Sequence, residues 1–96
     1  MRGGWVYILA NRANGVLYVG VTSELAARVH QHRSGEASWF TARYGVHRLV
    51  HAEAFDTIED AIRQEKTIKR WPRQWKINLI RHTNPGWTDL YDTICS

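Results

Sequence analysis

An Asn14-Gly15 dipeptide between two short apolar segments, residues 5–10 and 16–22, is the feature that most constrains this chain. Both segments are rich in β-branched and aromatic residues, which is typical of β-strands. Asn-Gly between two such segments is the strongest short-range signal for a β-hairpin, because these residues readily adopt the positive φ angles of a tight turn. We therefore expect two antiparallel strands at the start of the chain.

The two faces of the predicted hairpin differ in character. If an even number of residues forms the loop, Tyr7 and Tyr18 point to the same face, because side chains alternate along a strand. Gly20 lies on that face too, where its missing side chain leaves room beside the aromatic rings. The opposite face carries aliphatic side chains (Val6, Ile8, Leu17, Val19 and Val21). The hairpin is thus predicted to have one aliphatic face and one aromatic face.

Between the hairpin and the middle of the chain we expect a helix, a loop and a strand. Ser23 is positioned to cap a helix over residues 24–32. Residues 33–45 contain two glycines and are predicted to be a loop. Residues 47–55 then read as a third strand.

A second helix is predicted after Thr57, which is positioned as its cap. Its apolar stripe has the 0, 3, 4, 7, 10 spacing of one helical face and consists of Ile58, Ala61, Ile62, Glu65 and Ile68. Glu65 is therefore expected among core-facing residues. A carboxylate there is costly unless it is paired or bound to a metal ion.

Trp71-Pro72 is expected to end this helix and to begin a third one, because proline suits a first helical turn. The buried side of the third helix is predicted to consist of Trp75, Leu79 and Ile80. Asn84-Pro85-Gly86 should stop it. The aromatic and aliphatic residues of the tail (Trp87, Leu90, Tyr91 and Ile94) are expected to pack back onto the body.

The size and composition indicate one domain over residues 1–96. Cys95 is the single cysteine, so neither a disulfide within the chain nor a cysteine-based metal site is expected. No signal peptide and no apolar segment of about 18 residues is present, which argues against a membrane span. We expect a cytoplasmic protein, with association with the nucleoid as an alternative, and the oligomeric state stays open.

Positive charge is concentrated between Arg63 and Arg81, where seven basic residues accompany a single acid, Glu65. Such a stripe favours a polyanionic partner, and the candidate nucleic-acid-binding residues are Lys66, Lys69, Arg70, Arg73 and Lys76. A solvated helix face is the alternative explanation. The five tryptophans either fill the core of a small domain or stack on bases.

Hydrolysis of a phosphodiester bond requires an activated water, a neutralised phosphate and groups held in line. Glu65 could hold Mg²⁺ or Mn²⁺, because such ions often take only one or two carboxylates and complete their shell with water. Arg28 offers the rigid fork that binds phosphate oxygens, and His32 is its neighbour four residues on. Tyr7, Tyr18 or His32 could transfer protons.

Each of these features also has a simpler explanation. Paired tyrosines on a hairpin are often packing residues, and an arginine and a glutamate often form a structural salt bridge. His32 can equally be a capping or surface group. Composition and spacing alone leave these alternatives open.

Two half-motifs, Trp5-Val6-Tyr7 and Tyr18-Val19-Gly20, resemble the two halves of the signature of the GIY-YIG endonuclease superfamily. The resemblance extends from Trp5 to about Asp92. It is to the small stand-alone bacterial proteins of this superfamily, of the kind called YhbQ-like or UPF0213. Each half-motif alone is a weak signal, whereas the set is specific.

Three later residues carry the same resemblance. Arg28 stands ten residues after the second tyrosine, as the family's arginine does. The segment 61–69 resembles the helix that carries the family's metal-binding glutamate, which corresponds to Glu65. Asn84 falls where members often have a late asparagine.

The resemblance implies an α/β fold with a central three-stranded antiparallel sheet flanked by helices. It implies one ion, Mg²⁺ or Mn²⁺, at Glu65, and a site lined by Tyr7 and Tyr18, one of which acts as general base or positions water. Arg28 would bind the scissile phosphate with His32 beside it. Gly20 and Asn84 would be supporting residues.

The chain departs from the family pattern in three respects. Trp5 replaces the glycine of the first half-motif. Relatives such as the excision-repair incision subunit have a lysine just past the second half-motif, where this chain has Val21-Thr22-Ser23. Larger members add a DNA-targeting domain, for which this chain has no room, so specificity is low or a protein partner supplies it.

The leading hypothesis is a metal-dependent DNA endonuclease acting in repair or on structured DNA, with RNA as an alternative substrate. The second is a nucleic-acid-binding module with the same fold and little or no catalysis. The third is a protein-interaction adaptor that uses the tail around Trp87 and Tyr91.

Overall fold

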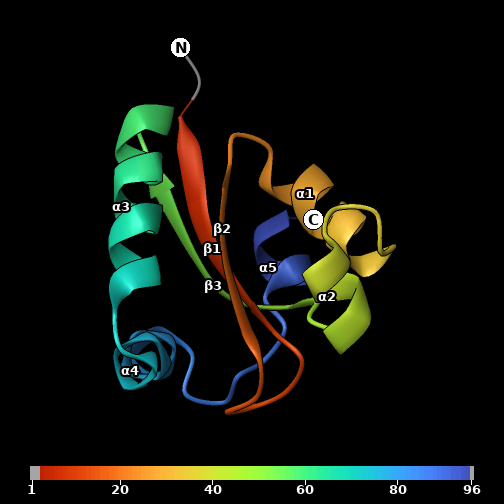
Figure 1. Ribbon diagram of the computed structural model, residues 1–96. Coiled ribbons are helices and arrows are strands. Elements are labelled where there is room, and N and C mark those ends of the chain that lie inside the picture. The colour runs from red at the N-terminus through yellow and green to blue at the C-terminus, as the bar shows by residue number, and fades with distance from the viewer. Residues whose placement is uncertain (1–2, 96) are drawn as a thin grey trace.

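The computed structural model describes residues 3–95, with the backbone alone at Cys95. The strands are β1 (Gly4–Ala10), β2 (Leu17–Thr22) and β3 (Arg48–Phe55). The helices are α1 (Leu25–Arg33), α2 (Trp39–Tyr44), α3 (Ile58–Arg70), α4 (Arg73–Thr83) and α5 (Tyr91–Cys95). Figure 1 shows the sheet between α3 and α4 on one side and α1, α2 and α5 on the other.

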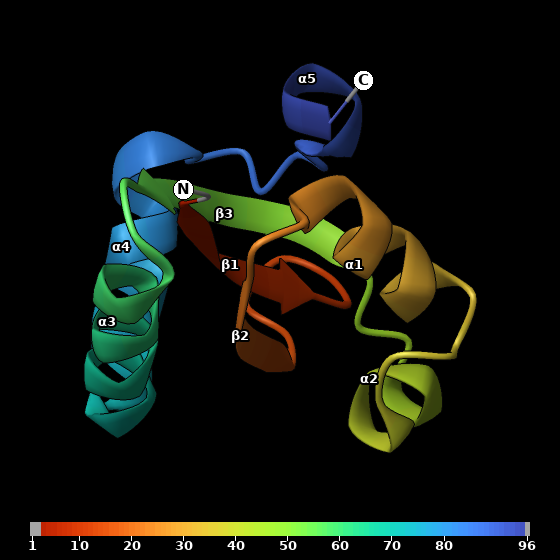
Figure 2. The same ribbon diagram turned by 90° about the horizontal axis from the view of Figure 1, so that it is seen from above.

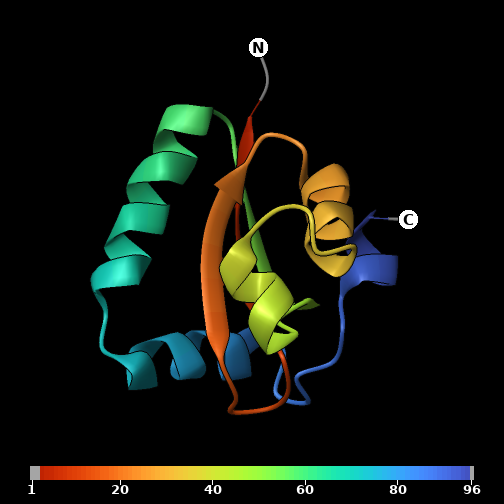
Figure 3. The same cartoon turned by 45° about the vertical axis from the view of Figure 1, so that its right-hand side comes forward.

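The three strands form one antiparallel sheet in the order β2-β1-β3. Views from above and from the side show a helix layer on each face (Figures 2 and 3). The register between β1 and β3 shifts by one residue after Ile8, so Val50 of β3 forms a bulge. The predicted α/β fold with a three-stranded antiparallel sheet flanked by helices is confirmed.

The hairpin of β1 and β2 has the predicted register. Tyr7 pairs with Gly20, and Leu9 pairs with Tyr18, so the two tyrosines and Gly20 share one face. Asn14 adopts the positive φ of 57° that the turn requires. The tyrosine face and the aliphatic face are therefore separated as expected.

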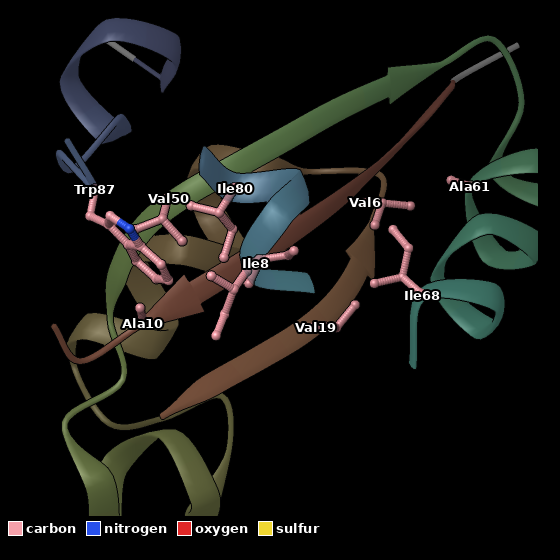
Figure 4. Close-up of a cluster of buried hydrophobic side chains, with 10 residues drawn as sticks. Val6, Ile8, Ala10, Val19, Val50, Ala61, Ile68, Ile80 and Trp87 are labelled. Carbon is pink, nitrogen blue, oxygen red and sulfur yellow. The ribbon is translucent and has the colours of Figure 1, made fainter. Parts of the chain in front are cut away.

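Each face of the sheet supports its own core. The aliphatic face of β1 and β2 packs against α3 and α4, and Figure 4 shows Val6, Ile8 and Val19 facing Ile68 and Ile80. Burial of these aliphatic and aromatic side chains is the main favourable term in folding.

The second core lies on the tyrosine face. There Tyr7 and Leu9 pack with Leu25 and Val29 of α1 and with Leu49 of β3. Burial of this apolar surface fixes α1 against the sheet. Because Tyr7 belongs to this core, its hydroxyl is held in one position by packing.

Two local predictions in the first half were wrong. Ser23 does not cap α1, because the helix begins one residue later than predicted and Glu24, without a side-chain cap bond, is its N-cap; the Glu24 backbone N–H donates to the hydroxyl of Thr22 at 3.0 Å. The predicted loop over residues 33–45 contains α2, which Ser38 caps by accepting from the Thr41 N–H. Gly45, with φ of 63°, ends that helix.

The second half departs from the prediction on two helix faces: Ile62, which was predicted to be on the core-facing stripe of α3, is 37% exposed, and the buried side of α4 differs from the predicted one. Thr57 caps α3, with the Asp60 N–H donating to its hydroxyl at 3.1 Å. On α4, Ile77 and Ile80 are buried. Trp75 was predicted to be on the buried side, but it is 55% exposed. Among residues 3–95, no helix is long and apolar enough to cross a membrane.

The tail contains a short helix, α5, that was not predicted. Trp87 is buried in the core beside Val50, and the guanidinium of Arg33 stacks on the ring of Tyr91. Arg33 also forms an ion pair with Asp89. These contacts occupy Trp87 and one face of Tyr91, so Trp87 is not exposed to a protein partner as the adaptor hypothesis requires.

Candidate active site

A chain of hydrogen bonds runs from β1 through α1 to α2. The hydroxyl oxygen of Tyr7 lies 2.9 Å from Nε2 of His32, and Nδ1 of His32 lies 3.0 Å from the hydroxyl of Thr41. The Thr41 hydroxyl in turn lies 3.2 Å from the backbone carbonyl of Ser38. All three side chains are buried. The chain therefore links the tyrosine face of the sheet to the first turn of α2.

The direction of these bonds follows from the proton of Thr41. A carbonyl oxygen can only accept, so the Thr41 hydroxyl donates its one proton to Ser38. Thr41 must then accept from Nδ1–H of His32, which leaves the lone pair of Nε2 facing Tyr7. The Tyr7 hydroxyl consequently donates to His32. The structure thus fixes one tautomer of a neutral histidine.

Tyr18 completes an aromatic cluster on the same face. Its ring centroid lies 6.4 Å from that of Tyr7 and 5.0 Å from that of His32. Phe40 of α2 lies on its other side at 6.2 Å. Tyr7 is buried and Tyr18 is partly exposed, so Tyr18 stands between the buried phenol and solvent.

Gly20 leaves room for Tyr7, as predicted. A Cβ atom at residue 20 would lie 2.4 Å from both Cζ and the hydroxyl oxygen of Tyr7, closer than such atoms approach one another. Any side chain at this position would displace the phenol from His32. The glycine is therefore required by the position of the Tyr7 ring rather than by a backbone angle.

Arg28 acts electrostatically on both members of the Tyr7–His32 pair. Burial, followed by the positive charge of Arg28, lowers the pKa of His32 to about 4. The pKa of Tyr7 is raised above its usual value by burial and then by the nearby Tyr18 phenol, and Arg28 opposes that rise. Arg28 is half-buried on α1. Near neutral pH the structure therefore holds an intact phenol and a neutral imidazole beside a guanidinium.

Glu65 also acts on this cluster. It lies on α3, is 8% exposed, and its negative charge contributes to the raised pKa of Tyr7. Its carboxylate forms an ion pair with Lys69, one turn further along α3, at 2.6 Å. The prediction that Glu65 lies among core-facing residues is confirmed, and Lys69 is the partner of its carboxylate in this structure. Its charge reaches the buried phenol even though α3 packs on the opposite face of the sheet.

Among residues 3–95, no group of three or more histidine, cysteine, aspartate and glutamate side chains is placed to hold a metal ion. Glu65 is the carboxylate that acts on Tyr7. A single carboxylate suits Mg²⁺ or Mn²⁺, which retain several waters and bind substrate phosphates, and does not suit a metal that needs a complete protein cage.

Asn84 lies outside this cluster. Its amide donates to the carbonyls of Val50 at 3.1 Å and Thr88 at 2.9 Å, and its oxygen accepts from the backbone N–H of Thr88 at 3.2 Å. These bonds tie the segment after α4 to β3. Asn84 is thus part of the framework of the fold and does not contact the Tyr7–His32 pair.

The predicted nucleic-acid-binding residues do not form one free cationic row. The guanidinium of Arg73 donates to the carbonyls of Asn14 at 2.8 Å and Gly15 at 2.6 Å, so it braces the hairpin turn. Lys76 donates to the carbonyl of Lys69, at the end of α3, at 3.4 Å. These two residues have structural contacts that the sequence did not reveal.

The other three cations lie on the exposed surface of α3. Lys66 and Arg70 are exposed, and neither has an ion pair with another described side chain. Lys69 is half exposed in its pair with Glu65. Lys66 and Arg70 therefore remain available to contact phosphates, and Lys69 becomes available if Glu65 takes another partner.

Thr41 and Phe40 are site residues that sequence reasoning did not find. Both lie on α2, in the segment predicted to be a loop. Ser38, a residue type that often caps helices, was the available sequence signal for a helix start. In the structure its hydroxyl accepts from the Thr41 backbone N–H. Their contact with His32 and Tyr18 depends on tertiary packing, which local patterns do not contain.

This arrangement agrees with the comparisons with known proteins. The model of the GIY-YIG catalytic domain matches residues 3–78, which is more than half of the 96-residue chain. The chain therefore belongs to the GIY-YIG family, whose domains are generally nucleases. The resemblance inferred from the two half-motifs is confirmed.

Within this family the chain groups with the UPF0213 proteins. It is 37% identical over 82 residues to the UPF0213 protein of Staphylococcus aureus strain Mu3, and the match covers 84% of this chain and 98% of that protein. The identity and coverage are the same for the UPF0213 protein of strain USA300. The solution structure of UPF0213 protein BH0048 from Bacillus halodurans superposes with a TM-score of 0.57 at 29% identity, covering 98% of this chain and 99% of that one.

Proposed function

We propose that this protein is a metal-dependent endonuclease that hydrolyses phosphodiester bonds of DNA. Membership of the GIY-YIG family supports nuclease chemistry on a nucleic acid. One observation carries the proposal: three groups act on the Tyr7 hydroxyl. His32 accepts its hydrogen bond, and the opposite charges of Arg28 and Glu65 both act on its pKa. A phenol that merely filled the core would need a hydrogen-bond partner, but not a guanidinium and a carboxylate acting on it as well.

Arg28 is the proposed phosphate ligand. Its guanidinium has no carboxylate partner among the described residues and is half exposed. A phosphodiester anion there would form charge-assisted, bidentate hydrogen bonds. It would also offset the positive charge that lowers the pKa of His32, so that substrate binding raises the basicity of the imidazole.

Tyr7 and His32 form the proposed proton relay. Because the phenol of Tyr7 donates to His32, its oxygen lone pairs can accept a proton from the attacking water while its own proton passes to Nε2. The raised pKa of Tyr7 means that it works as an intact phenol and not as a standing phenolate. Thr41 holds His32 in the tautomer that this transfer needs.

Tyr18 is proposed to order the water or the substrate at the mouth of the site. It is partly exposed and lies beside both Tyr7 and His32. Its hydroxyl has no hydrogen bond to a described residue that would compete with this role. Either tyrosine could in principle receive the proton, and the bond to His32 favours Tyr7.

Glu65 is the proposed ligand of one Mg²⁺ or Mn²⁺ ion. A bound divalent ion would neutralise charge on the phosphate and stabilise the leaving 3′ oxygen. The residues fit such an ion, because Lys69 is 52% exposed and can swing into solvent when Glu65 takes another cation. The lysine then serves as the partner of the buried carboxylate in the metal-free protein.

Cleavage of DNA by purified protein tests this proposal. Supercoiled, branched and single-stranded DNA are incubated with Mg²⁺ or Mn²⁺ and compared between wild type and Glu65→Ala. Glu59→Ala, on the exposed face of the same helix, is the matched control. We expect cleavage by wild type and Glu59→Ala only, and equal cleavage by Glu65→Ala would refute the assignment.

The proposal also names the kind of nucleic acid that the protein cleaves. Structured or damaged DNA, as in repair, is the proposed target, with RNA as the alternative. A protein partner that directs the domain to this target is also part of the proposal. Competition between branched DNA, duplex DNA and RNA of equal length ranks these substrates.

A nucleic-acid-binding module without catalysis is the second candidate. Two observations favour it: a lysine already neutralises Glu65, and no lysine follows the second half-motif. It predicts salt-sensitive binding that Glu65→Ala leaves unchanged, without cleavage under any metal condition.

A further inference from the structure

A shallow groove lies on the outer side of α4, away from the tyrosine cluster in sequence. It has a volume of about 460 Å³ and is lined by Trp71, Trp75, Asn78, Leu79 and His82. The four α4 residues follow the 0, 3, 4, 7 spacing of one helical face. At about 100° per residue, that face lies on the opposite side of α4 from the buried Ile77 and Ile80, and Trp75 on it is exposed.

The groove displays aromatic rings to solvent. Trp75 is 55% exposed, and its ring centroid lies 6.0 Å from that of Trp71 at an interplanar angle of 66°. Trp71 is partly buried against the aliphatic core, which holds it in place. An exposed tryptophan beside a second ring, at a groove of this size, is characteristic of a binding surface.

The charge around the groove identifies the class of ligand. Between Lys66 and Thr88 the chain has six lysines and arginines and no aspartate or glutamate. Three of the six (Lys69, Arg73 and Lys76) have the contacts described above, and the other three (Lys66, Arg70 and Arg81) are exposed and form no ion pair with a described side chain. Arg70 precedes Trp71, and Arg81 lies on α4 one residue before His82. A second copy of this chain would bring two such cationic surfaces together, which repulsion disfavours. A polyanion with flat apolar faces is the complementary ligand.

We propose that this groove binds a single-stranded segment of nucleic acid. Bases stack on Trp75 and Trp71, and phosphates lie near Arg70 and Arg81. Stacking needs unpaired bases, so a duplex would gain only the phosphate contacts. The inference rests on the proposed function in taking nucleic acid as the substrate, and it adds that the substrate has an unpaired strand.

The groove begins near the proposed metal ligand along the chain. Trp71 stands just past the end of α3, six residues after Glu65 or about 9 Å along the helix axis. A strand held at the groove would therefore be anchored beside the end of the helix that carries Glu65. The groove would favour substrates in which a single strand adjoins the bond that is cut.

Fluorescence anisotropy with a labelled oligothymidylate and a labelled duplex of equal length, in metal-free buffer, tests this inference. The variants are Trp75→Ala and Trp75→Tyr. Trp39→Ala is the matched control, since Trp39 is 72% exposed on α2. Because Trp75 lies on the surface, thermal melting should show all variants folded. We expect Trp75→Ala to weaken binding of the single strand about tenfold and binding of the duplex by less than about twofold.

Recovery of binding in Trp75→Tyr and unchanged binding in Trp39→Ala would support stacking at the groove. Equal affinity of wild type and Trp75→Ala for the single strand overturns the inference. A second result would also overturn it: wild type sediments as a dimer, Trp75→Ala sediments as a monomer, and the variant still binds the single strand. The groove would then be a self-association surface. If the protein cleaves DNA with a metal ion but Trp75→Ala binds the single strand as wild type does, the proposed function holds and the inference about the groove is refuted. If Trp75→Ala weakens binding but no cleavage occurs, the inference about the groove holds and the proposed function is refuted.

Discussion

The hydroxyl of Tyr7 donates to Nε2 of His32 across 2.9 Å, from the central strand of the sheet to α1. This bond has one direction, because the single N–H of the neutral imidazole, at Nδ1, donates to Thr41 and leaves Nε2 as an acceptor. A buried phenol and a buried imidazole therefore share a proton path with no charge on either group near neutral pH.

Tyr7→Phe should abolish cleavage while leaving the fold intact. The variant loses the hydroxyl that relays the proton, and general acid–base groups contribute about 10²–10⁴-fold to rates. Stability should fall by only about 1 kcal/mol, the typical net value of one hydrogen bond. Single-turnover cleavage and urea unfolding measure the two effects. Tyr44→Phe, on the exposed end of α2, is the control, and a similar loss in both variants would contradict the assignment.

Thr41→Val should lower the cleavage rate without touching substrate. The buried Nδ1–H of His32 loses its acceptor, so the fixed tautomer is lost and the fold is destabilised by about 1–3 kcal/mol. A shift of the pH–rate profile relative to wild type would distinguish this positioning role from a simple loss of stability. Thr67→Val, on the exposed surface of α3, is the control and should change neither quantity.

Gly20→Ala should be one of the most damaging small substitutions in the sheet. The new Cβ would lie 2.4 Å from the hydroxyl oxygen of Tyr7, so the ring must move away from His32. Overpacking of this kind costs about 1–3 kcal/mol. Gly86→Ala places its Cβ at an ordinary 3.7 Å from Thr88 and should be tolerated. Thermal melting and cleavage assays of both variants check this, and a fully active Gly20→Ala would show that the ring position is not critical.

Stability should decline in mild acid because of His32. Its pKa is about 4 in the folded protein, below the usual value of about 6.5, so the unfolded chain binds more protons between these pH values. The stabilisation is complete above about pH 6.5 and is lost as the pH falls to about 4, for a total of up to about 3 kcal/mol. His32→Gln should remove this part of the pH dependence. Chemical unfolding of both proteins at a series of pH values measures it, and parallel curves would disprove the effect.

The sequence predicted the elements whose signals are local. Asn14-Gly15 determined the hairpin and, with it, the common face of Tyr7 and Tyr18. Thr57 and the periodic stripe determined α3 and the burial of Glu65. These residues act through turn geometry, capping and amphipathic spacing, which neighbours in the chain define.

Features that depend on tertiary packing were not predicted. The six residues of α2 are too few to show a periodic pattern, so the helix that supplies Thr41 and Phe40 read as a loop. Trp75 fits an apolar stripe as well as Ile77 does, and only the position of α4 on the sheet decides which is buried. Arg73 appeared to be a free cation until the fold placed the hairpin turn beside it.

Locating Mn²⁺ by anomalous scattering in a crystal of the protein soaked with that ion tests the central claim most directly. We expect one ion bound to a carboxylate oxygen of Glu65, with Lys69 displaced and with Tyr7, Tyr18 and Arg28 facing its open side. An intact Glu65–Lys69 pair at saturating Mn²⁺, or an ion bound only elsewhere, would contradict it.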